Sequence, residues 1–247
     1  MLNLKHYFML KFIMKFILFA NARSGSTSLA ETLASSSEAN LSMEPFHPKY
    51  VEWNPDEKDY AEIIKSEEDM REAIKEISKK YNAMKVLKYQ FSKRICSAML
   101  LEKDIKIINL SRKNAFDAAL SSLIAQQTNI WQKEDEKEVG KLEEIPIYKI
   151  QEIVEHYDED NDYYAKLLND NKPNDHIDLF YEDIFSENNE KNIKLIQDIT
   201  NFLDISMPSE DVIAKYMVPS SASIESKKRY KDIPNWKEIK EEFREYI

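Results

Sequence analysis

The sequence predicts an α/β fold with three layers, in which a central, mostly parallel β-sheet lies between helices. From residue 15 onward, short runs rich in β-branched and aromatic residues alternate with longer runs of helical periodicity. This alternation is typical of crossover units, which join parallel strands through helices. The length of 247 residues suffices for one substantial core, so we expect a single domain.

Five short runs predict the strands. The first, residues 16–20, is apolar throughout, and the fourth, residues 104–110, is strongly β-branched. Continuous apolar runs of this kind fit strands that are buried on both faces of a parallel sheet. The second run is short and leads into a loop at Glu44 and Pro45. The expected strands are residues 15–20, 41–50, 84–89, 104–110 and 176–180.

The segments between the strands predict helices. Three serines, Ser35 to Ser37, end the first of them, and residues 59–81 combine apolar positions at helical spacing with a charged outer face. A helix of this kind is expected to cover the sheet. The expected helices are residues 26–34, 59–81, 91–102, 114–132, 146–171, 190–203 and 236–246.

The N-terminal segment has two interpretations. Residues 1–13 are expected to be an extension of uncertain order, in front of a single domain at residues 14–247. The alternative is a secretion signal over residues 10–22. Lys11 and Lys15 interrupt its apolar run, and cleavage would cut through the hydroxyl-rich loop that follows the first strand. We therefore favour the extension.

Composition narrows the class of protein. The chain has 35 basic and 45 acidic residues and a formal charge of −10, which argues against nonspecific binding to nucleic acid or to an anionic membrane surface. A single cysteine, Cys96, excludes an intramolecular disulfide, and the four histidines have none of the spacings of a zinc site. No run approaches the roughly 18 apolar residues of a membrane span. We expect a cytoplasmic protein without nucleic-acid partners, structural metal or membrane span.

The loop after the first strand predicts an anion site. The chain has only two glycines, and Gly25 is in this loop. A strand, a small polar loop and a helix place backbone N–H groups at the positive end of the helix dipole. Gly25 lets the backbone curl around phosphate or sulfate oxygens, and Arg23 adds a full charge. Further hydroxyl donors come from Ser24, Ser26, Thr27 and Ser28.

Two other interpretations of this loop stay open. An ordinary serine-rich helix cap would also explain its composition. A nucleotide kinase or other NTPase would bind phosphate here as well, but its loop requires G-x-x-x-x-G-K followed by Ser or Thr. The present loop has no lysine and only one glycine, which argues against the kinase.

A second motif follows the fourth strand. Arg112 is delivered to the edge of the sheet, and Ser121 follows about two to three turns along the next helix, so both can reach one phosphate. With both motifs the chain resembles the sulfotransferases that use 3′-phosphoadenosine 5′-phosphosulfate (PAPS), and within them the bacterial trehalose sulfotransferase type. A short element after the last strand, residues 181–183, is similar to one that recurs in the wider superfamily. The residues that carry the resemblance are Arg23 to Thr27, Glu44, Pro45, Lys85, Arg112, Ser121, Ala125, Gln127, Thr128 and Trp131.

The resemblance implies a P-loop nucleotide-kinase-like sulfotransferase fold and a set of roles. Residues 23–28 would bind the 5′-phosphosulfate, while Arg112 and Ser121 would bind the 3′-phosphate. Sulfuryl transfer needs orientation, a cationic clamp and a base more than it needs magnesium, so no metal is expected. Arg23 would hold the charge that develops on the departing phosphate. The implied acceptor is a carbohydrate or another small hydroxylated molecule.

The acceptor hydroxyl needs a general base. Glu44 matches the Glu-Pro position of the family and is the first candidate, although a turn carboxylate can also be a cap. His47 is the second, with an unperturbed pKa of ~6.5 against ~4.3 for Glu, although it can simply pack in its loop. Glu31 is the third and is more typical of a solvated surface acid. Lys85 can reach the donor or the acceptor.

Two functions of other classes remain as alternatives. A P-loop kinase would turn over ATP with magnesium in the absence of PAPS. A noncatalytic nucleotide-binding protein would bind PAPS and transfer nothing. The basic residues 227–231 either close over the 3′-phosphate or form a solvated face. The sequence predicts neither the acceptor's identity nor the oligomeric state.

Overall fold

The structure is a computed structural model, and it describes residues 14–47, 63–130, 141–185, 188–217 and 229–247. The predicted extension at residues 1–13 lies outside these ranges. So do Trp131, the first two of the basic residues 227–231 and the first part of the helix expected at residues 59–81.

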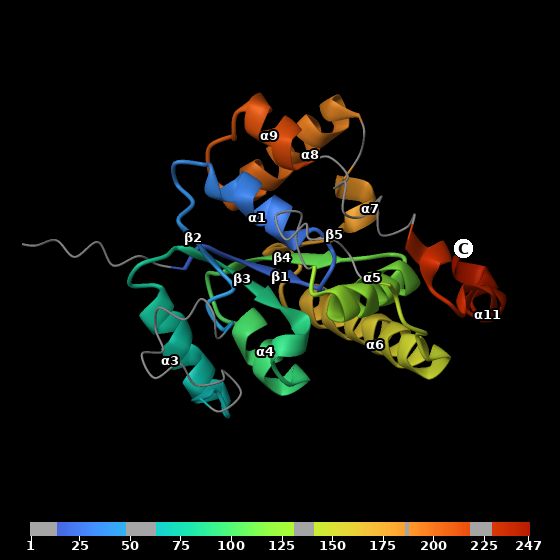
Figure 1. The fold of residues 1–247 in the computed structure, drawn as a ribbon. Helices are drawn as coiled ribbons and strands as arrows, with labels where there is room; N and C mark the ends of the chain where they lie inside the picture. Colours follow the sequence, from blue (N-terminus) through green and yellow to red (C-terminus); the bar gives the residue numbers. More distant parts are fainter. Residues whose placement is uncertain (1–13, 48–62, 131–140, 186–187, 218–228) are drawn as a thin grey trace, which may run out of the picture.

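A sheet of five parallel strands forms the centre of the protein (Figure 1). The strands lie in the order β2-β3-β1-β4-β5, so β1 is in the middle. Ile17 of β1 aligns with Met84 of β3 on one side and with Ile107 of β4 on the other. The predicted α/β class with a parallel sheet is therefore confirmed. The strands are β1 (Phe16–Ala20), β2 (Leu41–Met43), β3 (Ala83–Leu87), β4 (Lys106–Ser111) and β5 (His176–Phe180).

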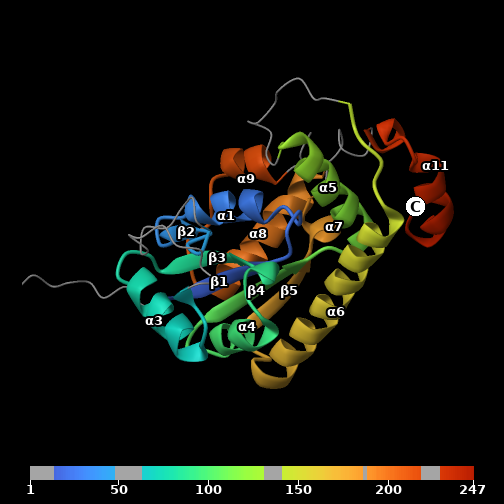
Figure 2. The same ribbon diagram turned by 60° about the horizontal axis from the view of Figure 1, so that its bottom comes forward.

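Helices cover both faces of this sheet, as the three-layer prediction requires (Figures 1 and 2). Successive strand residues point to opposite faces, so Ile17 and Phe19 join one hydrophobic cluster while Phe16 and Leu18 join the other. The first cluster includes residues of α3 (Glu67–Ile77), α4 (Lys93–Leu100) and α6 (Ile147–Asn171). The second includes residues of α1 (Ser26–Ala34), α8 (Asn189–Leu203) and α9 (Glu210–Tyr216).

A third apolar cluster joins the C-terminal segment to the rest of the fold. Phe116 of α5 packs against Phe243, with ring centroids 5.0 Å apart. Tyr230 and Ile239 belong to the same cluster. The C-terminal segment therefore lies against the start of α5 (Figure 1). Its elements are α5 (Ala115–Thr128), η4 (Tyr230–Asp232), α11 (Trp236–Glu242) and η5 (Arg244–Tyr246).

The topology determines where a ligand can bind. After β1 the chain pairs β3 on one side of that strand, and it later crosses to the other side to form β4. In open parallel sheets, ligands bind in the crevice outside the carboxyl ends of the strands where the strand order reverses. Here that point lies between β1 and its neighbours, directly at the loop that precedes α1.

The expected elements are present, and several boundaries differ for local reasons. The strand expected at residues 41–50 ends at Met43, because Glu44 has φ 52°, which is incompatible with an extended strand. The helix expected to run to Gln132 ends at Thr128, where Asn129 adopts the left-handed conformation. Within the described residues, two short α-helices were not predicted: α9 and α7 (Tyr181–Ile184). Both have at most seven residues, too few for a clear helical period.

The start of α3 predicts a measurable contribution to stability. Ser66 Oγ accepts a hydrogen bond from Asp69 N at 3.1 Å, and Asp69 Oδ2 accepts one from Ser66 N at 2.9 Å, so the two residues form a capping box. Replacing Ser66 by Ala should lower the free energy of unfolding by about 1 kcal/mol, as measured by urea denaturation. Ser92→Ala is the matched control, because Ser92 is the N-cap of α4 without a side-chain capping bond. Equal losses in both variants would contradict this role of Ser66.

Candidate active site

The carboxyl ends of the five strands bring the predicted site residues to one edge of the sheet. Glu44 follows β2, Lys85 lies in β3, and the loop with Arg23 and Gly25 follows β1. Arg112 follows β4. Because the strands are parallel, all of these ends point the same way. The structure thus brings together the residues that two separate sequence motifs predicted.

The loop before α1 requires a glycine at position 25. Gly25 is the N-cap residue of α1 with φ 72°, and a Cβ at this position would collide with the ring of Phe185. Arg23 also has a positive φ, 61°. A non-glycine residue in this region costs energy and is concentrated at functional sites. Gly25 has no side chain that could cap the helix, so the interpretation as a serine-rich cap fails at the cap position itself.

The hydroxyl groups of the loop have different partners. Ser24 is buried and its Oγ donates to Asn21 O at 2.6 Å, which closes the turn. Thr27 Oγ1 accepts a hydrogen bond from Lys85 Nζ at 2.9 Å. Ser26 is buried at the start of α1, and the carbonyl oxygen of Ser28 accepts a hydrogen bond from Thr32 Oγ1. Ser24 therefore stabilises the loop, whereas Thr27 lies beside a positive charge.

Two arginines and a serine form the first cluster of the site, which we call the arginine cluster: Arg23, Arg112 and Ser121. Arg23 Nε donates to Ser121 Oγ at 3.0 Å, and Arg112 Nη1 donates to the carbonyl oxygen of Arg23 at 3.1 Å. Burial lowers the pKa of Arg23, and the nearby positive charge of Arg112 lowers it further. Two like charges this close repel each other, and an anion between them would offset that repulsion.

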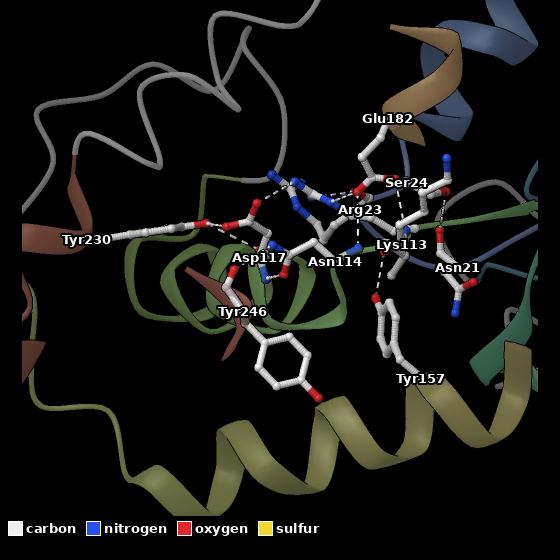
Figure 3. A network of polar contacts seen from close by, with 12 residues as sticks. Asn21, Arg23, Ser24, Lys113, Asn114, Asp117, Tyr157, Glu182, Tyr230 and Tyr246 are labelled. Carbon is white, nitrogen blue, oxygen red and sulfur yellow. Dashed lines mark hydrogen bonds and ion pairs between the residues drawn. The ribbon is translucent and has the colours of Figure 1, made fainter. Parts of the chain in front are cut away.

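Aromatic and acidic side chains surround the arginine cluster (Figure 3). Asp117 Oδ2 lies 3.7 Å from Arg112 Nη2, and the Tyr181 ring lies with its centroid 4.6 Å from Arg112 Cζ. Tyr230, from the C-terminal segment, donates to Asp117 Oδ1 at 3.3 Å. Arg112 is only 5% exposed. Its guanidinium is therefore enclosed by other side chains, among them Asp117 and Tyr181.

Tyr157 is a site residue that the sequence did not reveal. It projects from α6 toward the loop (Figure 3), and its hydroxyl donates to the carbonyl oxygen of Ala22 at 2.6 Å. Burial raises its pKa to about 12. It fixes the loop backbone one residue before Arg23. In the sequence Tyr157 is one apolar position of an amphipathic helix, and nothing in that pattern distinguishes it from a core residue.

Lys85, Thr27 and Glu44 form the second cluster, which we call the lysine cluster. Lys85 Nζ lies 2.6 Å from Glu44 Oε1 and also donates to Thr27. The Lys85 side chain is 2% exposed and that of Glu44 is 18% exposed, so the carboxylate is reachable at the surface of the site. Glu44 has φ 52°, so it joins Arg23 as a non-glycine site residue with a positive φ. The pair joins a potential base to a buried cation.

The other candidates for the base have different positions. His47 N donates to the carbonyl oxygen of Glu44 at 2.9 Å, which closes a turn that keeps the two residues together. Glu31 is exposed on α1. Lys215 of α9 lies near Glu31, and both helices pack on the same face of the sheet.

Lys88 lies directly after β3, but on the opposite face of the sheet from Lys85. It is buried, and its Nζ donates to Ser111 Oγ at 2.8 Å and to Asn161 Oδ1 at 3.2 Å. Burial lowers its pKa to about 7, although the carboxylates of Asp160 and Asp178 act in the other direction. This lysine therefore differs from Lys85, which has a carboxylate in direct contact.

No family model matches the chain, and no curated protein matches it. The mouse sulfotransferase SULT7A1 was solved in complex with PAP, which is 3′-phosphoadenosine 5′-phosphate. It is 17% identical over 86% of this chain and 65% of its own, with a TM-score of 0.46. The chain thus spans slightly less than two thirds of that protein. A sulfotransferase from Alicyclobacillus acidocaldarius is 13% identical over 92% of this chain and 95% of its own, with a TM-score of 0.45.

Retinol dehydratase, solved with retinol and PAP, is 16% identical over 95% of this chain and 70% of its own, with a TM-score of 0.42. All three TM-scores are below 0.5. Likenesses at this level identify no shared function, so the function has to be inferred from the residues of this chain. Within the part of the chain that the structure describes, no helix is both long enough and apolar enough to cross a bilayer.

The buried Lys88 predicts a pH dependence of stability. Between pH 7 and 10.5 the lysine is protonated in the unfolded chain and largely neutral in the folded one. The unfolded state then binds more protons, so this residue makes the free energy of unfolding rise with pH across that window. Lys88→Met removes the titration. Urea denaturation at pH 6.5, 7.5 and 8.5 should give a variant-minus-wild-type difference that falls as pH rises, and a constant difference would contradict the burial of a titrating amine.

Proposed function

We propose that this chain is a sulfotransferase that transfers a sulfuryl group from PAPS to the hydroxyl of a small acceptor. The observation that carries the proposal is the pairing of two cationic clusters across one loop. The arginine cluster and the lysine cluster each contact the segment of residues 23–27. A donor with separate 3′-phosphate and 5′-phosphosulfate groups needs two such sites, whereas ATP needs one continuous phosphate site with magnesium.

The arginine cluster is assigned to the 3′-phosphate. The resemblance implies this role for Arg112 and Ser121, and we assign it to Arg23 as well. The side chain of Arg23 donates to Ser121 and lies beside Arg112. Two guanidinium groups and a hydroxyl match the geometry and charge of a phosphate dianion. Arg23 would therefore contribute to recognition of the 3′-phosphate in addition to its expected role at the departing phosphate.

The lysine cluster is assigned to the chemical step. Lys85 would stabilise the charge on the leaving 5′-phosphate together with Arg23, because its ammonium donates a hydrogen bond to Thr27 at the start of α1. The backbone N–H groups at the start of α1 and the side chains of Ser26 and Ser28 would hold the phosphosulfate oxygens. In the step, the acceptor oxygen forms a bond to sulfur, and the bond between sulfur and the bridging phosphate oxygen breaks.

Glu44 is assigned as the general base that takes the proton of the acceptor hydroxyl. Its carboxylate is partly exposed, while the partner lysine is buried, so the acceptor approaches from the Glu44 side. Lys85 would contact both the base and the leaving group. This would hold the acceptor hydroxyl and the departing phosphate close to the sulfur, which favours transfer. His47, held next to Glu44 by the turn, is the second candidate.

The finer parts of the assignment rest on the resemblance of the motifs. We propose a carbohydrate as the acceptor class and the trehalose sulfotransferase type as the nearest group within the nucleotide-kinase-like sulfotransferase fold. A cytoplasmic location and a single domain at residues 14–247 stay predictions from the sequence. The direct test is release of PAP from PAPS in the presence of a panel of hydroxylated molecules, sugars included. Hydrolysis of magnesium-ATP, with no acceptor-dependent release of PAP, would favour the kinase instead.

Arg112 gives the first prediction for the donor. Replacing it by Met should weaken binding of PAP by roughly 2–4 kcal/mol, because the phosphate loses a buried charged partner. Binding of ADP, which lacks the 3′-phosphate, should change much less. Isothermal titration calorimetry measures both affinities, and thermal unfolding checks that the variant is folded. Unchanged discrimination between PAP and ADP would remove Arg112 from the donor site.

Glu44 gives the prediction for catalysis. Glu44→Gln should slow transfer by about 10²–10⁴, the usual contribution of a general base, and should leave PAP binding nearly intact. Steady-state kinetics with an acceptor from the panel measures the first quantity, and calorimetry measures the second. His47→Asn is the comparison variant and should retain most activity. If the two variants exchange these outcomes, His47 is the base.

A further inference from the structure

The segment that follows β5 contacts both halves of the donor site. Residues 181–185 directly follow β5 and consist of α7 and its C-cap residue Phe185, and their sequence motif has no role in the assignments above. Tyr181 and Phe185 occupy the space beside Gly25 that a side chain would fill, and their rings lie 4.8 Å apart. The Tyr181 ring also faces the Arg112 guanidinium. A single turn of helix thus connects the loop before α1 to the arginine cluster.

Glu182 has the most specific set of contacts in this segment. Its Oε2 accepts a hydrogen bond from Lys113 N at 2.9 Å, and its Oε1 accepts one from Asn114 N at 3.3 Å. The same Oε1 lies 3.5 Å from Arg112 Nε. One carboxylate therefore holds three consecutive residues at the junction of β4 and α5 (Figure 3).

The contacts of Arg112 explain why a carboxylate is needed at this position. Nη1 points to the carbonyl oxygen of Arg23 and Nη2 points to Asp117, so Nε is the remaining point that fixes the plane of the guanidinium. Nε is buried and makes no hydrogen bond within the part of the chain that the structure describes, and Glu182 faces it as an ion-pair partner at 3.5 Å. Because the nearby charge of Arg23 repels Arg112, an opposing carboxylate offsets the repulsion. Each terminal nitrogen carries two N–H groups, and each makes one of these two contacts, to Arg23 O and to Asp117.

We propose that Glu182 is a positioning residue, which holds the Arg112 guanidinium in the plane that binds the 3′-phosphate of the donor. The inference rests on the proposed function. Glu182 does not itself touch the donor, because two anionic groups would repel each other. It acts through Arg112 and through the backbone turn at Lys113 and Asn114.

The test compares Glu182→Gln with Asp183→Asn. Both variants remove one negative charge from the same turn, but Asp183 pairs at the surface with Lys113 Nζ at 2.6 Å and is 54% exposed. Calorimetry measures binding of PAP and of ADP to wild type and to each variant. Glu182→Gln should weaken PAP by at least about fivefold, within the range for coupled neighbours, and should leave ADP within about twofold. Asp183→Asn should leave the ratio of the two affinities unchanged.

A double variant tests whether Glu182 acts through Arg112. In the Arg112→Met background, Glu182→Gln should cause no further loss of PAP affinity, because the group that it positions is absent. Full additivity of the two losses would overturn the proposal. Glu182→Asp is the variant to use if Glu182→Gln fails to fold. It keeps the charge but is shorter by one methylene, so it should still lower the PAP-to-ADP ratio, and a wild-type ratio would overturn the proposal.

The outcomes separate this inference from the proposed function. A wild-type protein that does not prefer PAP over ADP contradicts the proposed function itself. A wild-type preference that Glu182→Gln leaves unchanged overturns only the positioning role, as does an equal loss for both nucleotides. A gain in PAP affinity would show that the carboxylate competes with the phosphate, which also overturns the inference.

Discussion

The candidate site depends on holding two like charges, the guanidinium groups of Arg23 and Arg112, close together against their mutual repulsion. Arg23 and Arg112 come from different strand ends, and the guanidinium of Arg112 donates to the backbone of Arg23. Their mutual repulsion and desolvation are offset by Asp117 and Glu182 and by the Ser121 hydroxyl. A doubly charged phosphate would satisfy both guanidinium groups. In the function that we propose, this arrangement is preorganised for such an anion.

The loop between these charges is constrained from both sides of the sheet. From one side Tyr157 of α6 binds the carbonyl oxygen of Ala22, and from the other Phe185 fills the space next to Gly25. The loop joins the central strand to α1, so its conformation sets the distance between the arginine cluster and the lysine cluster. Positive φ values at Arg23 and Glu44 show where the backbone departs from its preferred conformations to achieve this arrangement.

Much of this architecture could be predicted from the sequence, because it depends on local patterns. Apolar runs predicted the strands, helical periodicity predicted α3, and Gly25, in a chain with only two glycines, pointed to the loop. The contacts between distant segments could not be predicted in the same way. Tyr157 has the pattern of a core residue, and it binds a carbonyl group 135 residues away.

The side-chain directions at the site were also beyond local patterns. No local pattern predicts that the Arg23 side chain contacts Ser121 while the Lys85 side chain contacts Thr27. That choice depends on the strand order, which puts β3 and β4 on opposite sides of β1. The short α7 was missed for a related reason, since four residues carry no period. What matters about α7 is its contacts with Gly25 and Arg112, which are distant in sequence.

The central claim is that the arginine cluster recognises a 3′-phosphate. The most direct measurement is a calorimetric titration of the wild-type protein with PAP, ADP and ATP, each with and without magnesium. The account predicts tight binding of PAP that is independent of magnesium and much weaker binding of ADP. Preferential binding of magnesium-ATP, or equal binding of PAP and ADP, would contradict it.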